Sequence, residues 1–102
     1  MKNAKVDLYL CGVKGYAAAQ VIVNSYLKHI GSVVIAPDTG TVDDPLEKIS
    51  QLFESNGVKV SSKDPAKVSE LALAIGWKKL INSSYQQVVV LHDSLLPKYR
   101  GW

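Results

Sequence analysis

The chain has 102 residues, of which 47% are hydrophobic and 21% are charged, and its formal net charge is +3. This length allows one domain, residues 1–102, with a modest hydrophobic core. The composition is ordinary for a globular protein and excludes a mainly disordered chain. The net charge is small and the lysines are dispersed, so we expect no nucleic-acid partner.

The cysteine content, the amino-terminal segment and the lengths of the apolar runs indicate the cellular compartment. The single cysteine, Cys11, excludes an internal disulfide and a cysteine-based metal site, and we expect no bound metal. Charged residues interrupt the amino-terminal segment, so it does not resemble a secretory signal. No apolar run approaches the length of a membrane-spanning helix. Together these features predict a cytoplasmic protein without a membrane partner.

The first third of the chain alternates between strand and helix patterns. Residues 6–11 form a short apolar run that predicts a strand. In residues 16–30, apolar side chains recur at spacings of three and four, which predicts a helix with one buried face. Gly31 is well placed to end that helix. Residues 32–36 are rich in β-branched side chains and are stopped by Pro37, as expected for a second strand.

A second helix is expected to begin near Asp44. The Asp44 side chain can cap the first turn, Pro45 suits the first helical position, and Glu47 would complete a capping box. An Asn-Gly pair at 56–57 is expected to end the helix. Residues 58–60 then predict a short third strand.

The next segment has two interpretations. Residues 64–70 begin like a capped helix, and residues 71–77 could continue it, because leucine and alanine are good helix formers. Alternatively, residues 71–77 form a strand, since a nearly continuous apolar run ending near a glycine suits a strand buried on both faces. We favour the strand. Residues 78–85 then predict a short helix or a loop, and residues 87–91 predict the last strand.

The alternation of strands and helices predicts an α/β fold. We expect a Rossmann-like three-layer α/β/α domain with a mostly parallel sheet of about five strands and helices on both faces. In such sheets, ligands bind in the crevice at the carboxyl ends of the strands. The loops predicted to face that crevice are residues 12–16, 37–43, 76–79 and 92–101.

The first strand-to-helix turn holds a partial nucleotide-binding pattern. Gly12 and Gly15 are present, but a third glycine of the Gly-x-Gly-x-x-Gly fingerprint is missing. Asp38 lies roughly where a ribose-binding acid would be. A nucleotide site and a simple tight turn are both possible, and we favour the turn.

Cys11 could act as a nucleophile, although its position at the end of an apolar strand favours a buried, inert thiol.

Both histidines allow a structural and a catalytic interpretation. His29 lies near the end of the first predicted helix, where the helix dipole favours a cationic side chain, so a surface role is preferred. His92 follows the last strand and precedes Asp93 and Ser94. Three such residues in sequence do not make a catalytic triad, which is assembled in space. The residues alone leave a functional histidine and a local backbone-bonding role equally open.

A longer motif around His92 favours function. Residues 91–101, Leu-His-Asp-Ser-Leu-Leu-Pro-Lys-Tyr-Arg-Gly, resemble the signature of the N10-formyltetrahydrofolate-dependent formyltransferases. That family includes methionyl-tRNA formyltransferase, glycinamide ribonucleotide formyltransferase and the sugar N-formyltransferases, and the His-Asp-Ser version is most similar to the sugar type. Residues 75–81, Ile-Gly-Trp-Lys-Lys-Leu-Ile, resemble the segment that these enzymes carry one strand earlier. Residues 1–74 are similar only in topology.

The resemblance implies a fold, a reaction and a site. The expected fold is the Rossmann-like amino-terminal part of a formyltransferase domain. The expected reaction transfers a formyl group from N10-formyltetrahydrofolate to a small-molecule amine acceptor, such as an amine on a nucleotide-linked sugar. His92 would be catalytic, because a histidine beside an amide donor can stabilise the tetrahedral oxyanion. The residues implied at the folate site are Ser94, Leu95, Leu96, Pro97 and Trp77.

Two departures from the family pattern matter. Val90 stands where the family has an asparagine, and valine cannot donate a side-chain hydrogen bond. The family aspartate lies a few tens of residues beyond the histidine, so Asp93 does not match it. We therefore expect a truncated domain that is inactive alone and whose exposed last strand favours a homo-oligomer. The alternative is a non-catalytic Rossmann-like binding or assembly module.

Overall fold

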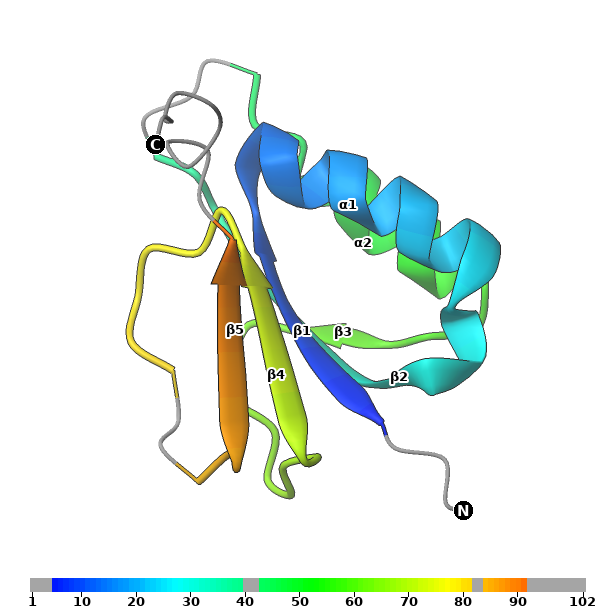
Figure 1. Cartoon of the computed structure of the whole chain (residues 1–102). Helices are drawn as coiled ribbons and strands as arrows, with labels where there is room; N and C mark the ends of the chain where they lie inside the picture. The colour runs from blue at the N-terminus through cyan, green and yellow to red at the C-terminus, as the bar shows by residue number, and fades with distance from the viewer. Residues whose placement is uncertain (1–4, 40–42, 82–83, 92–102) are drawn as a thin grey trace, which may run out of the picture.

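A single parallel sheet organises the molecule. The computed structural model describes residues 5–39, 43–81 and 84–91. Its five strands are all parallel and lie in the order β3-β2-β1-β4-β5 (Figure 1). Their bounds are β1 Val6–Cys11, β2 Ile30–Ala36, β3 Val60–Ser61, β4 Leu71–Ile75 and β5 Gln87–Leu91. The predicted five-stranded, Rossmann-like parallel sheet is confirmed, including the strand interpretation of residues 71–77.

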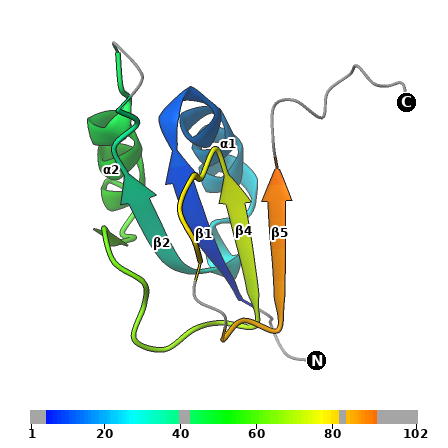
Figure 2. The same cartoon turned by 90° about the vertical axis from the view of Figure 1, so that its left-hand side faces the viewer.

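Both α-helices lie on the same face of this sheet. They are α1 (Gly12–Ser25) and α2 (Leu46–Glu54), and they pack side by side (Figures 1 and 2). A short 3-10 helix, η1 (Leu27–His29), connects α1 to β2. Helix α1 begins directly after β1, earlier than the sequence pattern indicates. Gly31 does not end the helix, as we predicted, but lies within β2.

The start of α2 also differs from the prediction. The N-cap position is occupied by Pro45, and no side chain makes a capping hydrogen bond. Asp44, the predicted cap, instead accepts a hydrogen bond from the backbone N–H of Asp38 at 2.8 Å. The predicted capping box is therefore wrong, because a loop amide competes successfully for the Asp44 carboxylate.

Strand alternation divides the interior into two apolar clusters. Successive side chains of a strand point to opposite faces, so Leu8 and Leu10 face the helices while Tyr9 faces away from them. The helix-side core contains Leu8, Leu10, Ala19, Val33, Ile35, Ile49, Phe53 and Ile75. The opposite core is smaller and contains Tyr9, Val34, Ala72, Ala74 and Tyr85, with Val68, Trp77 and Ile81 packed against it.

The second face is covered by irregular chain in the described parts of the molecule. The segments before β4 and between β4 and β5 cross this face without forming a helix (Figure 2). The helical expectation for residues 64–70 is therefore wrong, whereas for residues 78–85 the loop alternative holds in the described positions. Side-chain hydrogen bonds explain the outcome for the first segment, since Ser69 donates both its N–H and its hydroxyl to the buried Asp7. Within the described ranges, no helix is long and apolar enough to cross a membrane.

Candidate functional site

The candidate site lies at the carboxyl edge of the sheet, where the strand order reverses between β1 and β4. In doubly wound sheets, this switch point opens the crevice in which ligands bind. The chain leaves β1 at Gly12, and Asp38 and Gly76 follow β2 and β4. These three residues meet at the same edge, because all the strands run in parallel.

Gly12 is held close to the Asp38 carboxylate. Its φ is +73°, and a Cβ added there would lie 2.7 Å from Asp38 Oδ2. The positive φ therefore favours glycine at this position, and any side chain would also force the Asp38 carboxylate to move. Gly15 allows a second close approach, since its Cβ would lie 3.1 Å from the Leu10 carbonyl carbon. The two glycines thus bring α1 tightly against β1 and the loop after β2.

An ion pair connects the loops on either side of β1. Lys78 Nζ lies 3.0 Å from Asp38 Oδ1, and the side chains are 70% and 14% exposed. The hydrogen bond with Asp38 raises the pKa of Lys78, so the lysine stays cationic. Such exposed pairs contribute little to stability. Their value here is positional, because this pair ties the segment after β4 to the segment after β2.

Cys11 lies beneath this edge and is a poor nucleophile. It is 4% exposed, and its thiol donates a hydrogen bond to the Pro37 carbonyl at 3.6 Å. Burial raises the pKa of the Cys11 thiol, and the nearby negative charge of Asp38 raises it further. Because the thiolate is the reactive form, the structure favours the inert interpretation.

Trp77 is the one residue of the predicted folate site that lies in the described part of the chain. It follows Gly76, whose φ is +71° and whose Cβ would overlap the Cys11 carbonyl oxygen. This tight turn sends the half-buried indole onto the second face, edge-on against Tyr9 at a centroid distance of 5.3 Å. Trp77 Nε1 is buried and has no hydrogen-bond partner among the residues described. Buried donors are normally paired, so this N–H is available to an acceptor that reaches it.

The remaining predicted site residues lie outside the described residues: His92, Ser94, Leu95, Leu96 and Pro97. The structure does describe the strand that precedes them. β5 pairs with β4 so that Leu91 lies opposite Ile75. The two segments of the formyltransferase-like motif therefore follow adjacent parallel strands.

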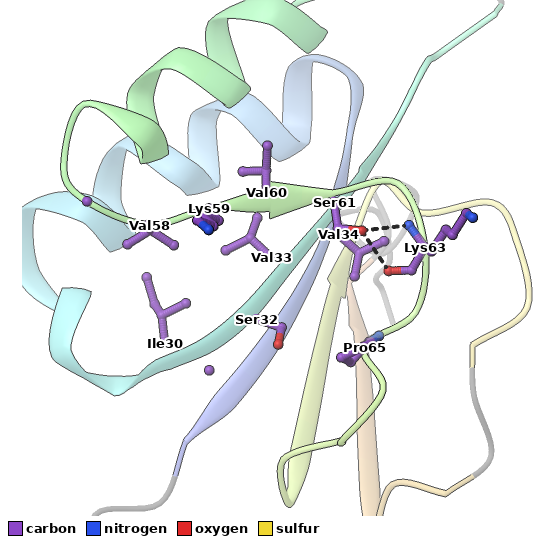
Figure 3. Close-up of a pocket in the computed structure, with 12 residues that line it drawn as sticks. Ile30, Ser32, Val33, Val34, Val58, Lys59, Val60, Ser61, Lys63 and Pro65 are labelled. Carbon is purple, nitrogen blue, oxygen red and sulfur yellow. Dashed lines mark hydrogen bonds between the residues drawn. The ribbon is translucent and has the colours of Figure 1, made fainter.

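Two other candidate features, His29 and a groove, lie away from the crevice. His29 is exposed in η1, just before β2 begins, and so lies at the amino edge of the sheet, away from the crevice. A groove with a volume of about 490 Å³ also lies away from the crevice, between β3 and the amino-terminal half of β2 (Figure 3). Valines line it, with Lys59 and Lys63 beside them. The loops after β1, β2 and β4, which hold Gly12, Asp38 and Gly76, contribute none of its lining residues.

A buried polar network is the main feature that the sequence analysis missed. Asp7 is 0% exposed, yet its carboxylate accepts hydrogen bonds from Ser32 N–H, Ser69 N–H, the Ser69 hydroxyl and the Tyr85 hydroxyl, at 2.7 to 2.9 Å. The sequence contained one indication of this network, since Asp7 is the one charged residue in an otherwise apolar strand. Buried charges require such partners, so Asp7 fixes the irregular segments to the sheet.

Tyr9 extends the network toward the surface. Its hydroxyl lies 2.8 Å from Tyr85 Oη and 2.8 Å from Asp64 Oδ1. Burial is the largest cause that raises the pKa of Tyr9 to about 12. Burial likewise raises the pKa of Tyr85. Both phenols therefore stay neutral near pH 7, which suits hydrogen-bond donation and does not suit general-base chemistry.

Comparisons with known proteins do not assign the chain to a family. No protein-family model matches it. Searches of curated proteins and of solved structures find no significant match. The functional argument therefore depends on the motif and on the geometry of the carboxyl edge.

Proposed function

We propose that this chain is a formyltransferase-like protein that binds N10-formyltetrahydrofolate at the carboxyl edge of its sheet. The observation that carries the proposal is the parallel pairing of β4 with β5, which ends with Ile75 opposite Leu91. The two motif segments, residues 75–81 and 91–101, begin at those paired positions. In this type of sheet, ligands bind in a crevice at the carboxyl ends of the strands. Both motif segments begin at such ends, on two adjacent strands.

The acceptor in this proposal is a small-molecule amine, such as an amine on a nucleotide-linked sugar. Exposed lysines at the crevice support an anionic ligand: Lys14 in the first turn of α1, and Lys78 and Lys79 after β4. One of them, Lys78, is partly neutralised by Asp38. The proposal also includes a cytoplasmic location and a homo-oligomeric state.

His92 is the proposed catalytic group. An amine attacks the formyl carbon, negative charge develops on the formyl oxygen, and a histidine can stabilise that charge or manage the proton. The amide donor of the family is replaced by Val90, whose side chain is 39% exposed on β5. We therefore expect the unmodified chain to bind folate but to transfer formyl groups very slowly or not at all.

Calorimetry with N10-formyltetrahydrofolate tests the binding part of the proposal. We expect saturable binding that is weakened at least tenfold by Leu96→Asp, because a charge in an apolar loop must be desolvated on contact with the ligand. Val21→Asp is the matched control, since Val21 is 58% exposed on α1 and lies outside both motif segments, so its change should leave binding unaltered. An absence of folate binding by the folded chain would reject the proposal.

A gain-of-function variant tests the catalytic part. Val90→Asn restores an amide donor two residues before His92, and the exposed position tolerates the change. We expect Val90→Asn to formylate a nucleotide-linked amino sugar faster than the native chain does, but still slowly, because the family aspartate stays unmatched. This gain should be lost in Val90→Asn/His92→Ala. Formylation that is insensitive to His92→Ala would contradict the assigned role.

The second candidate is a non-catalytic Rossmann-like binding or assembly module, and Val90 is the observation that favours it. In a nucleotide-binding version, Gly12, Gly15 and Asp38 would hold the ligand. Asp38 is already paired with Lys78, so a ribose hydroxyl would have to compete with that lysine. ADP or NAD binding that is lost in Asp38→Ala, without folate binding, would support this alternative.

A further inference from the structure

β5 is an exposed apolar strand at one edge of the sheet. Val88, Val90 and Leu91 are 40%, 39% and 48% exposed. Within the described residues, β5 pairs only with β4. Among the residues that the structure describes, Figure 2 shows neither a helix over β5 nor a strand beyond it. A parallel strand of this composition is normally covered on both faces, so this edge is suited to a partner.

The two edges of the sheet are protected differently. β3, at the opposite edge, is only two residues long, and Lys59 and Lys63 flank it. Short edge strands and lysines are the usual features that prevent edge-to-edge pairing. β5 has five residues, Gln-Val-Val-Val-Leu, with no charge among them. It lacks both kinds of protection.

The backbone of β5 shows which groups remain available. Gln87 donates its N–H toward the Glu70 carbonyl at 3.4 Å, so its backbone groups face β4. Because backbone groups alternate in direction along a strand, those of residues 89 and 91 also face β4. The N–H and C=O groups of Val88 and Val90 therefore point outward, away from the sheet.

We infer that β5 pairs with β5 of a second copy of this chain, antiparallel and about a two-fold axis through Val89. In this register Val88 of each copy lies opposite Val90 of the other, and both residues present outward N–H and C=O groups. They can then exchange hydrogen bonds as an antiparallel pair does. Val89 faces its own counterpart in the close, non-hydrogen-bonded position, where β-branched side chains pack well.

Side-chain pattern and charge also favour a second copy as the occupant. Val88 and Val90 lie on the Tyr9 face of the sheet, opposite Ala72 and Ala74 of β4, so cross-copy neighbours are apolar. An antiparallel arrangement sets the basic carboxyl edge of one copy, with Lys78 and Lys79, beside the amino edge of the other. Glu70 lies at that amino edge, immediately before β4.

The expected dimer is weak. An edge of five residues buries less than the roughly 1,200 Å² that stable interfaces usually reach. We therefore expect a dimer that dissociates on dilution, with a dissociation constant in the micromolar range. The inference rests on the homo-oligomeric part of the proposed function and specifies its interface. Formation of the dimer does not depend on folate binding, so failure of the formyltransferase activity and failure of edge pairing are separate outcomes.

Val90→Pro is the decisive variant, because it removes an outward N–H without breaking a β4–β5 hydrogen bond. Sedimentation velocity over a hundredfold concentration range should show a monomer–dimer equilibrium for the native chain and a monomer for Val90→Pro. Val90→Thr is the matched control, since it keeps the N–H and the β-branched shape, and it should still dimerise. Circular dichroism and urea denaturation verify that each variant is folded, and Val88→Pro replaces Val90→Pro if the latter unfolds.

Two outcomes would overturn the inference. One is a native chain that stays monomeric at every concentration. The other is a dimer that persists in both folded proline variants. A dimer lost in Leu80→Lys but kept in Val90→Pro would locate the association at another apolar surface and would equally reject edge pairing.

Discussion

The Tyr85 hydroxyl donates a hydrogen bond of 2.7 Å to the Asp7 carboxylate, joining residues 78 positions apart in the sequence. Asp7 lies in the central strand, and Tyr85 lies in the irregular segment just before the edge strand β5. This bond, with those from Ser69, fastens both irregular segments to the second face of the sheet. The Tyr85 bond lies two residues before the first residue of β5, Gln87.

Tyr85→Phe is expected to destabilise the chain by about 1.5–3 kcal/mol, the usual contribution of a hydrogen bond to a charged group. The buried carboxylate loses a donor, while the phenyl ring still fills the apolar space. Urea denaturation with a fluorescence readout measures the change. Tyr26→Phe is the control, because Tyr26 is 54% exposed and should change the free energy of unfolding by less than about 0.5 kcal/mol. Equal effects in the two variants would show that the Asp7 network is not stabilising.

Local patterns in the sequence predicted the sheet well. Apolar runs at residues 6–11, 32–36, 71–77 and 87–91 each overlap an observed strand. Gly12, Pro37 and Gly76 mark the ends of the first three runs, and a parallel strand buried on both faces needs little more to be recognised. The clearest success is β4, whose leucines and alanines also favour a helix. Topology, not propensity, decided the correct interpretation there.

The second face could not be predicted because side chains distant in sequence organise it. The segment at 64–70 has a capping pattern, but the buried Asp7 carboxylate accepts hydrogen bonds from Ser69. Asp44 likewise receives the Asp38 N–H and does not cap α2. The Ser69–Asp7 bonds join positions 62 residues apart, whereas the Asp38–Asp44 bond joins positions six residues apart in one loop, and each replaces the capping bond that the local pattern predicts. The candidate site was partly predictable, since Gly12, Asp38 and Trp77 were singled out, but the Asp38–Lys78 pair depends on two loops whose contact no local pattern encodes.

Gly12→Ala is expected to be more damaging than Gly57→Ala. Both glycines have positive φ, +73° and +79°, so each alanine carries a backbone cost of about 1–2 kcal/mol. Only at Gly12 would the new Cβ also meet a carboxylate, that of Asp38; at Gly57 nothing lies within 4 Å. Urea denaturation measures how much each variant lowers the free energy of unfolding, and the difference between the two values reports this contact. We expect the difference to become smaller when both glycine variants are made in an Asp38→Ala background. An unchanged difference would show that Asp38 does not restrict position 12.

Cys11 is expected to be almost unreactive in the folded chain. The thiol is 4% exposed, and burial together with the charge of Asp38 raises its pKa. Reaction with Ellman's reagent at pH 8 should therefore be slow in buffer and fast in concentrated urea. Its rate in buffer should increase with each variant that lowers the free energy of unfolding, such as Tyr85→Phe. Rapid reaction of the native thiol would contradict the inert assignment and reopen a chemical role for Cys11.

The buried phenols predict a loss of stability in alkaline solution. The pKa of Tyr9 is raised from 10.0 to about 12, chiefly by burial, and the pKa of Tyr85 is also raised. Folding thus favours the protonated phenols. The contribution of Tyr9 is complete below pH 10 and is lost as the pH rises through about 12. Urea midpoints measured between pH 8 and pH 11.5 should fall above pH 10. The fall should be smaller in Tyr9→Phe, which has no phenol proton to lose at this position, whereas Tyr26→Phe should keep the native slope. An identical slope in Tyr9→Phe and the native chain would assign the alkaline transition to other groups.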